Sequence, residues 1–170
     1  MPRLHLLEID DQTWFPSVLR GCVQSLLALA WNIHVPFLQT ASAAALAANV
    51  LLKQLEDPSK YAVIDCCSGA GGPVSTIERH MNQALALRGD KAIRFCLTDL
   101  HPHLSEWKRL KHQSSNIEFV EGPVDAIAAK GLTREGEKEC RMFNLAFHHL
   151  DDPVARAVLA DTIKSADAIA

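Results

Sequence analysis

From residue 61 onward, short apolar runs alternate with segments of helical length, and this alternation restricts the fold more than any other feature of the chain. The pattern predicts strands at 61–66, 92–98, 117–120 and 142–147, with a fifth beginning in 167–170. It predicts helices at 73–87, 104–112 and 153–165, and a weak helix at 124–129. Strands separated by helices of this length are joined by right-handed crossovers and run parallel. The sequence therefore predicts an α/β fold in which helices cover both faces of a parallel sheet.

The region before the sheet has a different, helical pattern. Its apolar residues recur at three- and four-residue steps, as in Val18, Cys22, Leu26, Leu29 and Ile33. Pro36 is predicted to end this helix, and Ser42 to cap a second one that continues to Leu55. Asp57 and Pro58 then break the chain. We expect a helical cap over residues 1–58 and the sheet domain over residues 59–170.

Composition and charge exclude several functional classes. The 170 residues are 48% hydrophobic, which is enough for one core, and the net charge of -3 predicts neither a nucleic-acid nor a membrane partner. The most apolar stretch, 18–31, is shorter than the roughly 20 residues that span a bilayer. Five cysteines without a C-x-x-C pair indicate a reduced, cytoplasmic protein and no structural metal. The charged cluster 134–141 is interpreted as a solvated loop.

The end of the sequence limits the sheet that can form. With strand order 3-2-1-4, the fourth strand would be an apolar edge, which favours aggregation. The chain stops where a fifth strand should form. The sheet is therefore expected to be incomplete after strand 4 or 5. We interpret this as a truncated sequence, with missing C-terminal strands or a homo-oligomeric partner at that edge.

A glycine-rich turn follows the first predicted strand, in the run from residue 63 to 73. Glycines allow positive φ and a close backbone approach to a ligand, and ligands bind at the carboxyl ends of such strands. A P-loop is excluded because the turn ends at Gly72 and Pro73 with no lysine. A dinucleotide fingerprint is disfavoured because Val74 stands where it needs glycine or alanine. A purely structural tight turn remains an alternative.

The spacing Asp65-x-x-x-Gly69-x-Gly71 resembles the first motif of class I S-adenosylmethionine-dependent methyltransferases, which have a Rossmann-like fold. Cys67 departs from the motif, because it stands where the family has its first glycine. The resemblance covers about residues 61–165, and the layout is similar to that of fungal members of the superfamily. It implies S-adenosylmethionine as cofactor. The cofactor-binding residues that it implies are Asp65, Cys67, Ser68, Gly69, Ala70, Gly71, Asp99, Leu100, Val124, Asp125, Asn144 and Phe147.

Two acidic residues after later strands extend the resemblance. Asp99 ends the second predicted strand, where a carboxylate can accept both ribose hydroxyls. Asp125 follows the third strand, where the family contacts the adenine edge. Either residue could instead cap the helix after it, and the sequence leaves that alternative open.

Residues 143–153 resemble the fourth motif of small-molecule methyltransferases. There His148 or His149 is placed to act as a general base, with Asn144 orienting a small-molecule acceptor. Methyl transfer by the complete protein is thus the implied activity. The alternatives are a nicotinamide oxidoreductase, a truncated or degenerate cofactor-binding module without activity, and an interaction protein that uses its N-terminal helices.

Overall fold

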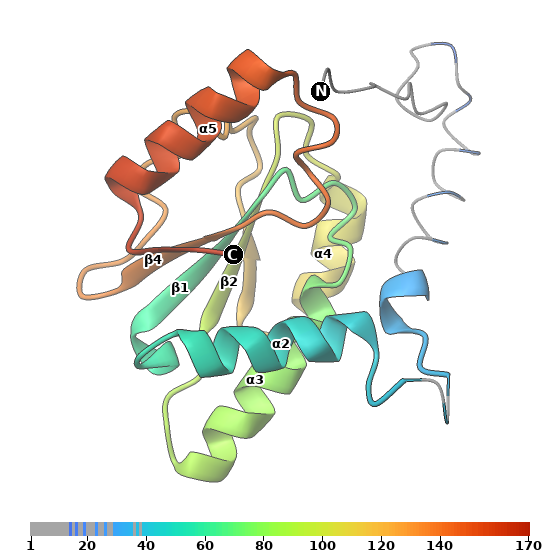
Figure 1. The fold of residues 1–170 in the computed structure, drawn as a ribbon, viewed down its shortest axis with the longest axis vertical. Coiled ribbons are helices and arrows are strands. Elements are labelled where there is room, and N and C mark those ends of the chain that lie inside the picture. The colour runs from blue at the N-terminus through green and yellow to red at the C-terminus, as the bar shows by residue number, and fades with distance from the viewer. Residues whose placement is uncertain are drawn as a thin grey trace.

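The computed structural model describes residues 39–170 continuously, together with 29–35 and the single positions 14, 16, 19, 23, 26 and 37 (Figure 1). The predicted helix over 18–33 is therefore only partly covered, and Val18, Cys22 and Pro36 lie outside the described residues. The proposed boundary between residues 58 and 59 remains a prediction. Among the described residues, no helix combines the length and apolar character that a bilayer crossing requires.

A parallel sheet forms the centre of the molecule. Its strands are β1 Tyr61–Cys66, β2 Arg94–Thr98, β3 Ile117–Phe119, β4 Lys138–Met142 and β5 Ala168–Ile169. The order β3-β2-β1-β4-β5 confirms the predicted α/β fold and its 3-2-1-4 arrangement. β5 pairs with β4 in parallel, through Cys140 opposite Ala168 and Arg141 opposite Ile169. The predicted fifth strand in 167–170 is therefore confirmed, and because it pairs with β4, the fourth strand is not the edge of the sheet.

The helices follow the sequence pattern closely. Over residues 39–170 they are α2 Ala43–Gln54, α3 Val74–Arg88, α4 Leu104–Gln113 and α5 Asp152–Ser165, and the 3-10 turn η2 Pro58–Lys60 leads into β1. Ser42 caps α2 as predicted, since its side chain accepts a hydrogen bond from the backbone N–H of Ala45. Asp151 caps α5 in the same way, through the N–H of Val154. Both caps place a short polar side chain where helical N–H groups lack partners.

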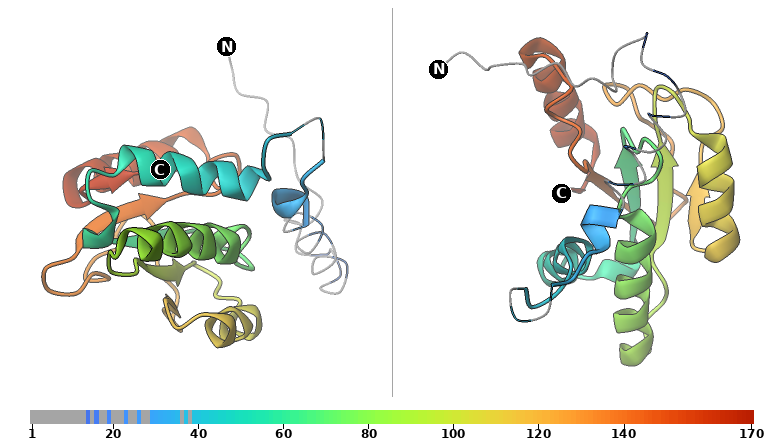
Figure 2. Two further views of the ribbon diagram at one scale, coloured as in Figure 1. Left: turned by 90° about the horizontal axis from the view of Figure 1, so that it is seen from below. Right: turned by 90° about the vertical axis from the view of Figure 1, so that its right-hand side faces the viewer.

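Two layers cover the sheet (Figures 1 and 2). On one face, α2, α3 and α4 pack against side chains such as Val63, Phe95 and Leu97. On the other, the segment 120–136 packs against Ile64 and Cys96, and α5 lies over β4. All six residues of β1 are buried, because the central strand has cover on both sides. The two layers leave the loops after the strands together at one edge of the sheet.

Two sequence predictions about the last third of the chain are wrong. The fourth strand is Lys138–Met142 and not 142–147, and part of the supposed solvated loop 134–141 is that strand. Charged residues concealed it: Glu139 and Arg141 are buried because they pair with each other. The predicted helix at 124–129 is also wrong, since this segment forms turns. In one of them the Asp125 carboxylate accepts from the N–H of Ile127.

Candidate functional site

The carboxyl ends of β1, β2, β3 and β4 bring all the sequence-predicted site residues to one edge of the sheet. The turn at 67–73 follows β1, and the loop at 99–103 follows β2. The loops at 120–126 and 143–151 follow β3 and β4. In a parallel sheet these ends share one edge, so residues far apart in the sequence become neighbours. Asn144 and Phe147 lie in a loop here, because β4 ends before them.

The glycine-rich turn has the left-handed backbone that its sequence requires. The φ angles are +51° at Gly69 and +95° at Gly71, while Cys67 adopts +56° although it is not glycine. The N–H of Ser68 donates to the Thr98 carbonyl over 3.0 Å, and that of Gly71 to the Ser68 carbonyl over 2.7 Å. The turn is thereby attached to the end of β2 as well as to β1.

Gly71 is the position in this turn that tolerates a side chain least. A Cβ there would come within 2.5 Å of Leu110 Cδ1, and Leu110 is buried in the core. We expect Gly71→Ala to lower the free energy of unfolding by about 2–4 kcal/mol, from left-handed strain together with overpacking. Gly69→Ala is the matched control, because its Cβ would meet nothing within 4 Å. Urea denaturation of both variants measures the difference, and equal losses would contradict this account.

Asp65 lies at the end of β1 with only 1% of its surface exposed. Its carboxylate accepts hydrogen bonds from the Ser68 hydroxyl and, over 2.8 Å, from the Asn144 side-chain amide. Burial raises the pKa of Asp65 to about 7; the two hydrogen bonds lower it in part, and the nearby Asp99 charge raises it further. This carboxyl therefore changes its charge near neutral pH.

Asp99 contacts the glycine turn directly. One carboxylate oxygen accepts from the Gly69 N–H over 2.8 Å, and the other accepts from the His101 N–H over 2.8 Å. The alternative that Asp99 caps the next helix is wrong, because the N-cap of α4 is His103. A carboxylate oxygen has two lone pairs, so each oxygen of Asp99 can still accept from a ligand.

The loop after β3 joins the same edge. The N–H of Val124 donates to the Asp99 carbonyl over 2.8 Å, which places the following Asp125 near the turn. Burial raises the pKa of Cys67 to about 11, and the charges of Asp99, Asp65 and Asp125 add to that rise. The Cys67 thiol therefore stays neutral at physiological pH.

The remaining predicted residues are more exposed. Leu100 is 54% exposed, and both His148 and His149 lie at the surface with their ring centroids 3.8 Å apart. The Phe147 ring packs 5.0 Å from that of Phe143, which orients the loop after β4. Ala70 is half-buried within the glycine turn. The roles of these residues toward a ligand remain predictions.

Two residues that support the turn were not predicted from the sequence. The Trp107 indole N–H donates to the Gly69 carbonyl over 2.9 Å, and its ring is fully buried. The Thr98 hydroxyl donates to the Asp65 carbonyl over 3.1 Å. Nothing in the sequence near Trp107 indicates which carbonyl its indole N–H reaches.

A solved structure of an O-methyltransferase family protein from Burkholderia thailandensis matches 87% of this chain with a TM-score of 0.56 and 16% identity. The chain shares the Rossmann-like α/β fold of that protein. It spans only 38% of the length of that protein. No family model matches the sequence, and no curated protein sequence is similar enough to count as a relative.

Two further solved structures are more distant. One is the mitomycin 7-O-methyltransferase MmcR, which matches 76% of this chain and 34% of its own with 15% identity and a TM-score of 0.45. The other is YjhP from E. coli, which matches 81% of this chain and 50% of its own with 17% identity and a TM-score of 0.46. Likenesses at this level carry no argument about function.

Proposed function

We propose that this domain binds S-adenosylmethionine at the carboxyl edge of the sheet, and that the complete protein transfers its methyl group to a small-molecule acceptor. The observation that carries the proposal is the hydrogen bond between the Gly69 N–H and the Asp99 carboxylate. It joins the turn that would hold the amino-acid end of the cofactor to the acid that would hold its ribose. A ligand that has both an amino-acid end and a ribose needs the glycine turn and Asp99 side by side.

The charges at this edge fit the proposed cofactor. S-adenosylmethionine carries a sulfonium and an ammonium, and Asp65, Asp99 and Asp125 all act electrostatically on the Cys67 thiol between them. Carboxylates favour a cationic ligand, most strongly where burial excludes water. The free lone pairs of Asp99 suit the two ribose hydroxyls, and the positive φ of Gly69 and Gly71 brings backbone close to a ligand. Cys67 is the residue of this turn that fits the proposed cofactor least well, because it carries a side chain where the backbone would approach the ligand.

When bound, S-adenosylmethionine supplies an activated methyl group, so the protein has to bind, orient and exclude water. Alignment of two reactants can contribute about 7–11 kcal/mol. Asn144 is held by Asp65, which fixes one side of the loop that follows β4. His148 or His149 in that loop would accept the proton of an acceptor hydroxyl.

Calorimetric titration with S-adenosylhomocysteine, beside NADH, tests the proposed binding. We expect S-adenosylhomocysteine to bind and Asp99→Asn to weaken its binding roughly 10- to 100-fold, because one charged acceptor for the ribose is lost. Asp90→Asn, in the exposed turn after α3, is the control and should bind as the parent does. Binding of NADH alone would favour an oxidoreductase instead, and binding of neither ligand would refute the proposal.

Replacement of both His148 and His149 by alanine tests the proposed base. With a hydroxyl acceptor we expect turnover by the complete protein to fall about 100-fold, since general-base catalysis contributes at least that much. Affinity for S-adenosylhomocysteine should stay unchanged. His112→Ala, at the end of α4 away from the carboxyl edge, is the matched control. Unchanged turnover in the double variant would remove the histidines from the mechanism.

A further inference from the structure

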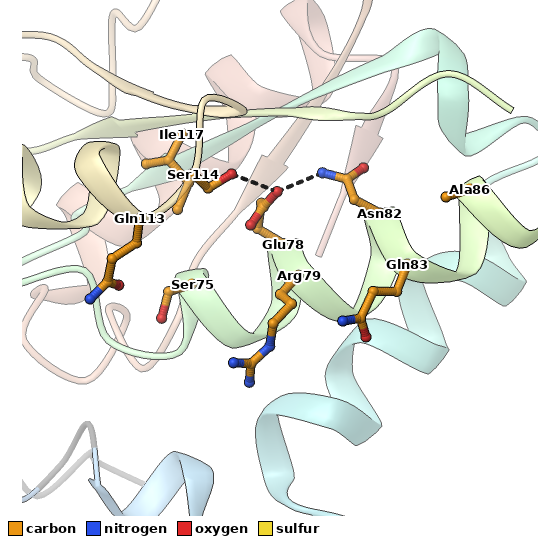
Figure 3. A pocket seen from close by; sticks show the side chains of 9 residues that line it. All are labelled: Ser75, Glu78, Arg79, Asn82, Gln83, Ala86, Gln113, Ser114 and Ile117. Carbon is orange, nitrogen blue, oxygen red and sulfur yellow. Dashed lines mark hydrogen bonds between the residues drawn. The ribbon is translucent and has the colours of Figure 1, made fainter.

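A polar groove lies along α3, between this helix and the segment that joins α4 to β3 (Figure 3). Its volume is about 620 Å³, within the range of small-molecule sites. The lining residues are Ser75, Glu78, Arg79, Asn82, Gln83 and Ala86 of α3, with Gln113, Ser114 and Ile117 opposite. No residue of the proposed cofactor site lines it, so it is a separate place on the molecule.

The Glu78 carboxylate lies at the centre of this groove with only 4% of the residue exposed. One of its oxygens, Oε1, receives three hydrogen bonds from neutral groups. Asn82 donates over 2.7 Å, Ser114 over 3.0 Å and Asn116 over 2.9 Å. These bonds hold the carboxylate in one orientation, so its position is set before any ligand arrives.

The second oxygen of Glu78 is differently placed. It accepts no hydrogen bond from any residue that the structure describes, and Figure 3 shows it turned away from Asn82 and Ser114. The neighbouring Arg79 also lines the groove, but Figure 3 shows its side chain directed away from Glu78, as adjacent residues on a helix do not face each other. A buried carboxylate with no cationic partner is costly, and a cation from outside would offset that cost.

We propose that this groove binds a small organic cation whose guanidinium or primary ammonium group contacts the free oxygen of Glu78. Such a head group has several N–H donors and needs several acceptors. The side-chain oxygens of Ser75, Gln83 and Gln113 lie in the same lining and can accept the others. A neutral ligand would leave the carboxylate unpaired, and an anion would be repelled by it.

Titration with n-butylguanidinium, followed by amide chemical shifts, tests the proposal, with n-butylurea as a neutral probe of the same shape. We expect the guanidinium to bind with a millimolar Kd and to shift the signals of Asn82, Ser114 and Gln113. The urea should bind with roughly tenfold lower affinity or less, because it lacks the charge. Equal effects of the two probes, or no effect of either, would overturn the proposal.

Two variants localise the binding. Glu78→Gln keeps the shape of the side chain and removes its charge, so the guanidinium should lose roughly tenfold or more in affinity. Gln83→Trp places a large ring in the groove at a position that donates no hydrogen bond to Glu78, and Leu87→Trp places the same ring on α3 at a 90% exposed position outside the lining. We expect Gln83→Trp to abolish binding and Leu87→Trp to preserve it. If Glu78→Gln does not fold, the comparison of Gln83→Trp with Leu87→Trp still tests the site. Equal affinity of these two variants for n-butylguanidinium would refute it.

Discussion

Asp65→Asn is expected to stabilise the fold above neutral pH and, at the same time, to weaken the binding of the proposed cofactor. In the folded protein, burial raises the pKa of Asp65 from its ordinary value of 3.8 to about 7. Above pH 7 the folded domain therefore contains an ionised carboxylate that is more stable in the unfolded chain. A difference of this size corresponds to roughly 4 kcal/mol.

The sign of the effect follows from proton binding. Between pH 4 and 7 the folded state holds the Asp65 proton and the unfolded state has released it, so this group makes stability fall as pH rises. Below pH 4 both states are protonated, and above pH 7 both are ionised, so the contribution is constant there. Asparagine has no proton to lose and can still bond with Ser68 and Asn144.

Urea denaturation from pH 4 to pH 8 measures the effect. The free energy of unfolding of Asp65→Asn, relative to the parent, should increase by up to about 4 kcal/mol across this interval. Asp90→Asn, at an exposed position, should follow the parent curve at every pH. A difference between Asp65→Asn and the parent that does not change with pH would show that the buried carboxyl does not titrate in this range.

The same variant should bind S-adenosylhomocysteine more weakly, because the ionised carboxylate that would attract the cationic end of the ligand is lost. In the parent protein, affinity should rise between pH 6 and pH 8 as Asp65 ionises. In Asp65→Asn that rise should be absent. A gain in stability combined with a loss of binding would be typical of a residue kept for function at a cost to the fold.

Arg141→Met is expected to lower the free energy of unfolding by about 3–5 kcal/mol. Arg141 has no exposed surface, and its guanidinium donates to Glu139 over 2.6 Å and to Asp161 over 2.7 Å. It also donates to the Ser165 hydroxyl and the Ala129 carbonyl, and so joins β4 to α5 and to the loop beneath it. Methionine fills similar space but leaves the buried Glu139 carboxylate without its cation.

Two further variants separate the contribution of this ion pair to the free energy of unfolding from the contribution of packing. Arg134→Met removes an arginine whose side chain is 62% exposed and pairs with Glu118, so it should cost at most about 1 kcal/mol. In the double variant Arg141→Met with Glu139→Gln, part of the loss should be recovered, because the buried Glu139 charge is gone and only the partly exposed Asp161 lacks its partner. Thermal or urea unfolding provides the measurement. If the double variant is no more stable than Arg141→Met alone, the loss comes from packing.

Much of the fold follows from local patterns in the sequence. The boundaries of β1 match the prediction at both ends, because a run of apolar residues between Pro58 and a glycine turn has few other conformations. The cap at Ser42 and the start of α4 at Leu104 follow from the same short-range rules. The alternation of strands with helices also predicts the parallel order, since crossovers of this length have one hand.

The fourth strand shows where such patterns fail. Three of the five residues in Lys138–Met142 are charged, so the sequence alone indicates a solvated loop there. Glu139 and Arg141 are buried because they form an ion pair with each other, and Asp161 of α5 forms a second ion pair with Arg141. That pairing depends on residues far apart in the chain, and no local window contains it.

The candidate site likewise has features that the sequence predicts and features that only the tertiary structure reveals. By itself the sequence determined which residues follow each strand: the acid before the glycine turn, the acid after the second strand and the histidines after the fourth. Only the tertiary structure decided that Gly69 meets Asp99, that Asn144 reaches Asp65 and that Trp107 supports the turn. The physical reason is that spacing along the chain sets local conformation, whereas burial, and with it the raised pKa of Asp65, depends on which distant segments pack together.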